Sequence, residues 1–142
     1  MPDVTVKELG DFDAVFGGGM RRVRAGLGVT SFGIQVIELP AGFTGYPAHD
    51  HTHDEQEEVY IPLNGPVTLE VGGTTLELHP GMFARVGPGE TRKLIAGDEP
   101  ARILCVGGTP GVVYQAPEWT EEGSRPPEMG PHGDDEKSHA AG

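Results

Sequence analysis

The chain of 142 residues has one cysteine, few basic residues and no long apolar run. Cys105 alone cannot form an intramolecular disulfide, and such sparing use of cysteine is typical of a reducing, cytoplasmic location. No stretch approaches the ~20 apolar residues that a membrane-spanning helix needs. The first residues, Met1–Val4, have neither the basic nor the apolar region of a secretory signal. We therefore expect a cytoplasmic protein without a membrane segment.

Positive charge is also scarce. Ten lysine and arginine residues stand against 22 acidic residues, which gives a formal net charge of −12 and a pI near 4.7. Nucleic acid backbones and anionic lipid surfaces repel a protein of this charge. The composition therefore predicts neither nucleic acid nor a membrane surface as a partner.

Glycine and proline are abundant instead. The 23 glycines and 13 prolines make up about a quarter of the chain, whereas average usage is roughly 12%. Together with a hydrophobic content of 36%, this excludes a helical bundle and favours a turn-rich, all-β domain. Apolar segments at intervals of eight to twelve residues are typical of a sandwich or barrel. The expected strands are 31–39, 57–63, 66–71, 74–79, 82–86, 91–96 and 102–106. Segment 12–20 has no clear pattern and is predicted to be loop.

The composition divides the chain into three parts. Residues 1–30 are expected to pack as a strand and loop segment on a barrel formed by residues 31–115. Residues 116–142 carry seven acidic and two basic residues from position 117 onward, with Trp119 and Met129 as their large apolar side chains. Such a segment buries too little surface to offset its ordering entropy. It is predicted to be a flexible acidic tail, pinned at Trp119.

Three of the six histidines fall within five residues. Alternate side chains of an extended strand point to the same face, so a regular strand would direct all three rings into one pocket. Carboxylates follow at once in the sequence. Two imidazoles and a carboxylate with open coordination positions are typical ligands of Fe, Mn, Ni, Co, Cu or Zn. A solvated or pH-sensitive loop is the alternative interpretation. The cluster comprises His49, His51, His53, Asp54, Glu55, Glu57 and Glu58.

The spacing around this cluster resembles a known family. Gly45 is followed by five residues, His51-Thr52-His53, four residues, Glu58, six residues and Gly65. This pattern is similar to the first motif of the cupin superfamily of small β-barrels. The second cupin motif has a counterpart between Gly81 and Arg92, in which Arg92 stands where the family has a histidine ligand. The resemblance covers roughly residues 32–107.

The resemblance implies a double-stranded β-helix, or jelly-roll, barrel, a homodimer formed through a sheet edge, and a divalent metal site. It implies His51, His53 and Glu58 as ligands. Arg92 cannot ligate a metal because guanidinium offers only donors. We expect it to bind a carboxylate, either of a substrate or of Glu58. His49 is a candidate replacement ligand, and a rival assignment pairs His49 with His51.

Three functional hypotheses follow. The first is a metal-dependent oxygenase or isomerase that acts on a small anionic organic substrate, with Arg92, Tyr60 and Gln56 as substrate-binding residues. The second is a metal-free binding module in which Arg92 pairs with Glu58 or with an anionic ligand. The third is metal-independent acid–base catalysis by a histidine and a neighbouring acid. Cys105 lies in an apolar run and is predicted to be a buried, inert thiol.

Overall fold

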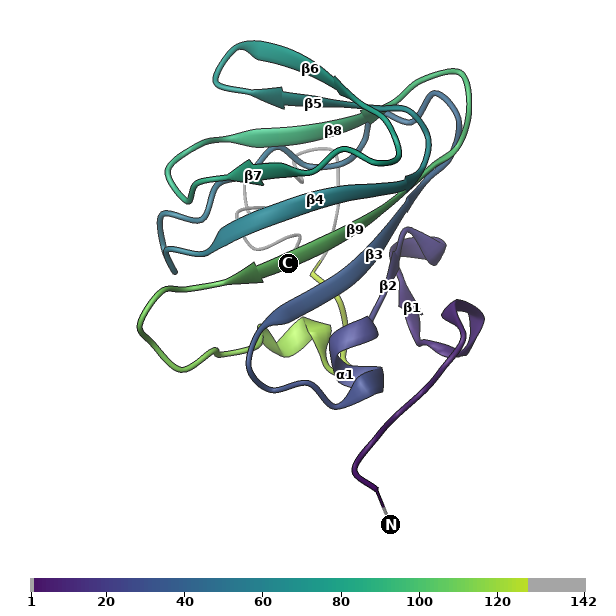
Figure 1. Cartoon of the computed structure of the whole chain (residues 1–142). Helices are drawn as coiled ribbons and strands as arrows, with labels where there is room; N and C mark the ends of the chain where they lie inside the picture. Colours follow the sequence, from purple (N-terminus) through teal and green to yellow (C-terminus); the bar gives the residue numbers. More distant parts are fainter. Residues whose placement is uncertain (1, 128–142) are drawn as a thin grey trace.

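The computed structural model describes residues 2–127, and these form a β-sandwich closed into a barrel (Figure 1). All seven predicted strands are confirmed, with ends shifted by one or two residues. They are β3 (Gly33–Leu39), β4 (Glu57–Asn64), β5 (Val67–Val71), β6 (Thr74–Leu78), β7 (Ala84–Val86), β8 (Arg92–Ala96) and β9 (Ala101–Gly108).

The strands are divided between two antiparallel sheets. The larger sheet has the order β1-β2-β3-β9-β4-β7, and the smaller has the order β6-β5-β8. The Gly72-Gly73 turn joins β5 to β6. Both residues have positive φ values, 56° and 80°, which tight hairpin turns need and glycine adopts without strain. Inward side chains of both sheets form one apolar core that includes Ile37, Leu69 and Ile103. This is the cupin jelly-roll predicted from the sequence.

The segment before β3 is more regular than the sequence predicts. Residues 12–20, expected to be loop, contain β1 (Ala14–Val15) and lead into β2 (Met20–Arg21), which extends the larger sheet beyond β3. A short helix, α1 (Val23–Leu27), follows and packs on β3. Two-residue strands and a five-residue helix are too short to show a period, and packing rather than propensity stabilises them. Single-turn 3-10 helices, η1 (Leu9–Asp11) and η2 (Phe16–Gly18), complete this segment.

Part of the predicted tail packs against this N-terminal segment. The 3-10 helix η3 (Glu118–Thr120) buries Trp119, whose ring centroid lies 5.6 Å from that of Phe16. The buried Arg22 guanidinium donates to the carbonyls of Trp119 and Ser124, at 2.6 Å each. Trp119 is thus an attachment point, as the sequence predicts. The prediction of flexibility for residues 128–142 lies outside the described residues.

Strand alternation determines which side chains of β4 and β9 point into the barrel. On β4, Glu58 and Tyr60 are buried while their neighbours are partly exposed. Glu58 pairs with Gly107 of β9, and Tyr60 pairs with Cys105. A Cβ atom at Gly107 would lie 3.1 Å from Glu58 Cγ and 2.8 Å from the side-chain oxygen of Gln56. Glycine at this position therefore leaves room for the Glu58 side chain.

None of the helices in residues 2–127 has the length and apolarity needed to cross a membrane.

Candidate metal centre

Backbone pairing outside the regular strands positions the first two histidines. His49 forms an isolated antiparallel bridge with Arg92, at the start of β8, through two backbone hydrogen bonds of 3.0 and 2.8 Å. The amide of His51 donates to the carbonyl of Pro88 at 2.9 Å. Both imidazoles are thereby held inside the barrel, where each is at least 97% buried.

The chain does not continue as a strand past His51, and this decides the position of His53. The amides of Asp54 and Glu55 both donate to the His51 carbonyl, which forms a turn, and Glu55 has a positive φ of 56°. The His53 side chain is consequently 47% exposed, with Nε2 3.4 Å from Asp54 Oδ2. His53 lies outside the buried group, and its assignment as a ligand stays a prediction. The regular strand on which that assignment rested is absent here.

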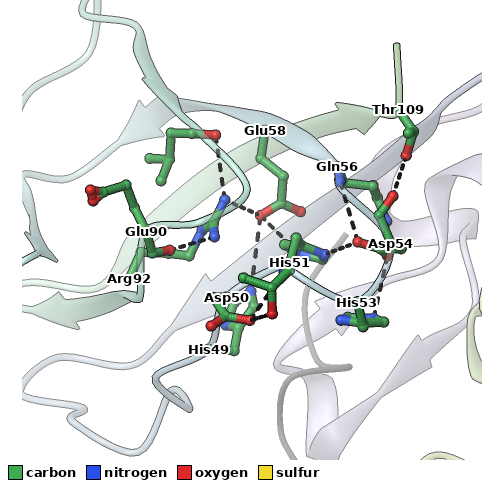
Figure 2. Close-up of polar contacts among 12 residues, drawn as sticks. His49, Asp50, His51, His53, Asp54, Gln56, Glu58, Glu90, Arg92 and Thr109 are labelled. Atoms are coloured by element: carbon green, nitrogen blue, oxygen red, sulfur yellow. Dashed lines mark hydrogen bonds and ion pairs between the residues drawn. The ribbon is translucent and has the colours of Figure 1, made fainter. Parts of the chain in front are cut away.

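The buried group is His49, His51 and Glu58, the pairing of the rival assignment. One ligand atom from each lies within 4.8 Å of the other two. His51 Nε2 is 3.3 Å from Glu58 Oε1, and His49 Nε2 is 3.9 Å from the same oxygen. Figure 2 shows both rings and the carboxylate directed toward one point. Two imidazoles and a carboxylate are the donor set that divalent transition metals accept.

Hydrogen bonds at the far side of each ring determine which nitrogen faces Glu58. His49 Nδ1 lies 3.1 Å from the carbonyl oxygen of Pro47. A carbonyl oxygen only accepts hydrogen bonds, so Nδ1 carries the proton and donates it. His51 Nδ1 donates to Asp54 Oδ1 at 3.0 Å. A neutral ring with Nδ1 protonated presents a lone pair at Nε2, which is the form that ligates metals. Neither Nε2 atom has a hydrogen-bond partner within the described chain.

The electrostatics of the group stabilise the carboxylate and the imidazolium. Burial opposes ionisation of Glu58, but its contacts with His49 and His51 outweigh burial and lower the pKa of Glu58 far below its usual value of 4.5. Burial likewise disfavours a charged His51 ring, yet Glu58 and Asp54 together raise the pKa of His51 above 6.5. Without another cation, the space between the rings and the carboxylate therefore favours a proton on His51.

Arg92 lies against the same Glu58 oxygen as the two histidines, with neither side chain exposed. Its Nη2 atom is 3.6 Å from Glu58 Oε1 and 3.4 Å from the carbonyl of Val86, and Nη1 donates to the carbonyl of Glu90 at 2.7 Å. The guanidinium is thus engaged largely with the protein itself. Of the two expectations for Arg92, the structure places it against Glu58.

The other two predicted substrate-binding residues, Tyr60 and Gln56, contact Glu58 and Asp54 respectively. The Tyr60 hydroxyl donates to Glu58 Oε1 at 2.8 Å. Gln56 Nε2 donates to Asp54 Oδ2 at 2.9 Å and so holds the carboxylate that orients His51. Cys105 is buried, as predicted, with Sγ 3.5 Å from Glu58 Oε2. Burial and the Glu58 charge raise the pKa of Cys105, which keeps it a thiol.

Two contributors were not singled out from the sequence. Asp54 was one acid in a charged run, and its contact with the His51 ring depends on a turn that spacing does not reveal. Tyr46 is 93% buried, its ring centroid lies 5.8 Å from that of His49, and its hydroxyl lies beside that of Tyr60. Burial and Glu58 raise the pKa of Tyr46 well above its usual range. Its position directly after the motif glycine Gly45 was the only available signal.

Comparison with known proteins identifies the family. A family model described as a cupin domain matches residues 35–107, just over half of the chain. The chain belongs to the cupin superfamily. A search of curated proteins finds no match.

Solved structures agree on the fold. A cupin protein from Bacteroides fragilis is 24% identical with a TM-score of 0.65, and the match covers 82% of this chain and 93% of that one. A cupin-superfamily sugar phosphate isomerase from Silicibacter pomeroyi is 22% identical with a TM-score of 0.61, covering 72% and 74%. A DMSP lyase from Ruegeria pomeroyi is 25% identical with a TM-score of 0.51, covering 65% and 45%.

Proposed function

We propose that the protein binds one divalent transition metal ion through His49, His51 and Glu58 and acts on a small organic anion. The observation that carries this proposal is the orientation of the two rings. Each Nδ1 is committed as a donor, and each Nε2 faces Glu58 Oε1 without a hydrogen-bond partner among residues 2–127. Two lone pairs and a carboxylate directed at one another repel unless a proton or a metal ion lies between them. A metal ion satisfies all three groups, so the donor set fits it.

Charge balance supports an anionic substrate. Glu58 and the adjacent Arg92 cancel each other's charge. With the Asp54 carboxylate on the His51 ring also counted, a dication leaves one uncompensated positive charge at the site, and burying such charge is unfavourable unless it is paired. A carboxylate or similar group on the substrate restores the balance. Its attraction to the site does not require a direct contact with Arg92.

The proposed chemistry is of the oxygenase or isomerase type. A bound metal of this kind supplies Lewis acidity at its open positions. The protein's own residues would orient the ligands: Asp54 and Gln56 hold the His51 ring, and Tyr60 holds the Glu58 carboxylate. Enclosure by the barrel would keep bulk water from the reacting group. The reaction type is a proposal. We also propose that the protein is cytoplasmic and forms a homodimer.

The deciding experiment is metal analysis of the untagged protein, purified without chelator and then offered Fe, Mn, Ni, Co, Cu and Zn separately. We expect about one equivalent per chain for at least one ion. His51→Ala should lose it while its far-ultraviolet circular dichroism is retained. His79→Ala, which changes an exposed histidine on a different turn, should keep it. Full metal content in His51→Ala would refute the ligand assignment.

A second candidate function rests on the Arg92 contact. With Nη2 at 3.6 Å from Glu58 Oε1, a permanent cation already lies beside the carboxylate. This favours a metal-free module that binds a small molecule, or uses a histidine for acid–base chemistry. Failure of every ion to bind above trace level would favour this candidate over the first.

A further inference from the structure

A cavity of about 560 Å³ lies at the end of the barrel where β3 finishes and β9 begins. The η2 turn, the start of β2 and segment 43–47 complete its wall. This volume is within the range of 300–1,000 Å³ in which proteins bind small organic ligands. None of the proposed metal ligands lines it, so the cavity is a compartment separate from the metal centre.

The lining determines what such a compartment accepts. Its side chains are mainly apolar and include Phe16, Met20, Leu39 and Phe43. The two charged residues in the lining, Glu38 and Arg102, already pair with each other, with Nε and Oε1 2.7 Å apart. A ligand charge placed here would find no free counter-charge. The cavity therefore suits the uncharged, apolar part of a molecule.

Tyr46 lies between the cavity and the metal centre. Its side chain lines the cavity, and its ring packs against that of His49 with centroids 5.8 Å apart. Its hydroxyl is buried beside that of Tyr60. A buried hydroxyl of this kind gains stability from an acceptor on a ligand. By contrast, the Tyr60 hydroxyl is committed to Glu58.

We propose that this protein's ligand is an amphipathic carboxylate, whose apolar body lies in the cavity and whose anionic head reaches the His49–His51–Glu58 site past Tyr46. The Tyr46 hydroxyl donates to the head group, and Phe43 packs against the body near the cavity mouth. The assignment of the head group rests on the proposed metal function, whereas the assignment of the body rests on the cavity alone. The side chains of His49 and Glu58 are fully buried. In this proposal the cavity is the path by which a ligand reaches them.

The test measures binding of straight-chain carboxylates, from acetate to octanoate, to the full chain by calorimetry. Cobalt(II)-loaded protein reports through its visible spectrum whether the head group reaches the metal. Displacement of the uncharged probe N-phenyl-1-naphthylamine reports occupation of the cavity and needs no metal. We expect affinity to rise about three- to fourfold per methylene, as burial of a CH₂ group predicts.

Two variants separate the ends of the ligand. Tyr46→Phe keeps the ring and should weaken every carboxylate equally, by about fivefold, because one hydrogen bond is lost. Phe43→Ala should weaken octanoate by about fivefold or more and leave acetate unchanged. Phe83→Ala, which changes an exposed phenylalanine that does not line the cavity, is the matched control and should change neither.

The outcomes distinguish this proposal from the metal function. If cobalt binds and carboxylates change its spectrum without any dependence on chain length, the cavity proposal is wrong and the metal function stands. If neither cobalt nor any of the other five ions binds, the metal function fails. Chain-length-dependent displacement of the probe, sensitive to Phe43→Ala, then still supports the cavity as the compartment for the apolar body. Absence of that displacement overturns the proposal in either case.

Discussion

Arg92 Nη2 lies 3.6 Å from Glu58 Oε1, and both side chains are completely buried. The guanidinium and the two imidazoles all lie around this same oxygen (Figure 2). A carboxylate buried alone would be costly, and this contact offsets that cost. The same contact places a fixed positive charge beside any cation that Glu58 binds. Arg92 therefore stabilises the empty site and weakens its affinity for metal.

Replacing Arg92 tests this opposition. We expect Arg92→His to raise metal affinity by about tenfold or more, a change of about 1.4 kcal/mol, because a permanent charge is lost and a ligand is added. The measurement is competition with a coloured chelator. Arg85→His alters an arginine whose ion pair with Glu57 is exposed, and it should leave the affinity unchanged. Equal affinities for the Arg92 variant and the native protein would contradict the argument.

Asp54 offers a test of ring orientation. Asp54→Ala removes the acceptor for His51 Nδ1, and loss of such an outer hydrogen bond typically lowers metal affinity about 10- to 100-fold. Asp54→Asn keeps an oxygen acceptor and should restore part of the affinity. The control is Asp50→Ala, since Asp50 accepts its hydrogen bonds from the amide and hydroxyl of Thr52. An unchanged dissociation constant in Asp54→Ala would show that the ring needs no such support.

The pH dependence of metal binding follows from the His51 ring. Glu58 and Asp54 outweigh burial and raise the pKa of His51 above 6.5 in the metal-free protein, and a metal must displace that proton. Affinity should therefore fall as the pH drops through this raised pKa, by about tenfold per pH unit below it. Glu58 cannot cause this loss, because its pKa is lowered far below 4.5. Titrations at pH 6, 7 and 8 measure the slope, and a flat profile would rule out displacement of a histidine proton.

The same proton affects folding in the opposite direction. Because the pKa of His51 is raised in the folded state, its contribution to stability is complete below the unfolded value of about 6.5. That contribution disappears as the pH rises through the folded value. The metal-free protein should thus lose stability on going from pH 6 to pH 8, measured by urea unfolding, whereas His51→Ala should show a smaller loss.

Trp119 tests the attachment of the C-terminal segment. Trp119→Ala removes a buried ring that contacts Phe16, and it should lower the free energy of unfolding by about 3 kcal/mol. Val113→Ala changes a side chain that is 83% exposed and should have little effect. If the two variants unfold at the same urea concentration, the segment contributes nothing to stability.

Local pattern predicted the strands and the neighbourhood of the site. Alternating apolar residues and glycine turns such as Gly72-Gly73 depend on short-range rules, so all seven strands were predicted. The motif spacing identified His51 and Glu58 correctly as neighbours. A strand was expected somewhere in residues 1–30, but the positions of β1, β2 and α1 were not predicted because each is too short to show a period.

The choice among the histidines depends on contacts distant in sequence. His53 turns outward because the chain bends after His51, and the bend is held by Thr109, whose hydroxyl donates to the Asp54 carbonyl at 2.8 Å. His49 turns inward because its backbone pairs with that of Arg92. These partners lie more than 40 residues away in the sequence, and spacing alone does not reveal them.

Arg22 links the two ends of the described chain. Its guanidinium, almost completely buried, binds Asp13 near the start and the carbonyls of Trp119 and Ser124 near the end. Leaving such donors unsatisfied in a buried position is costly. During synthesis, Arg22 leaves the ribosome about a hundred residues before Ser124 does. This closing contact must therefore wait until the segment at Ser124 is released.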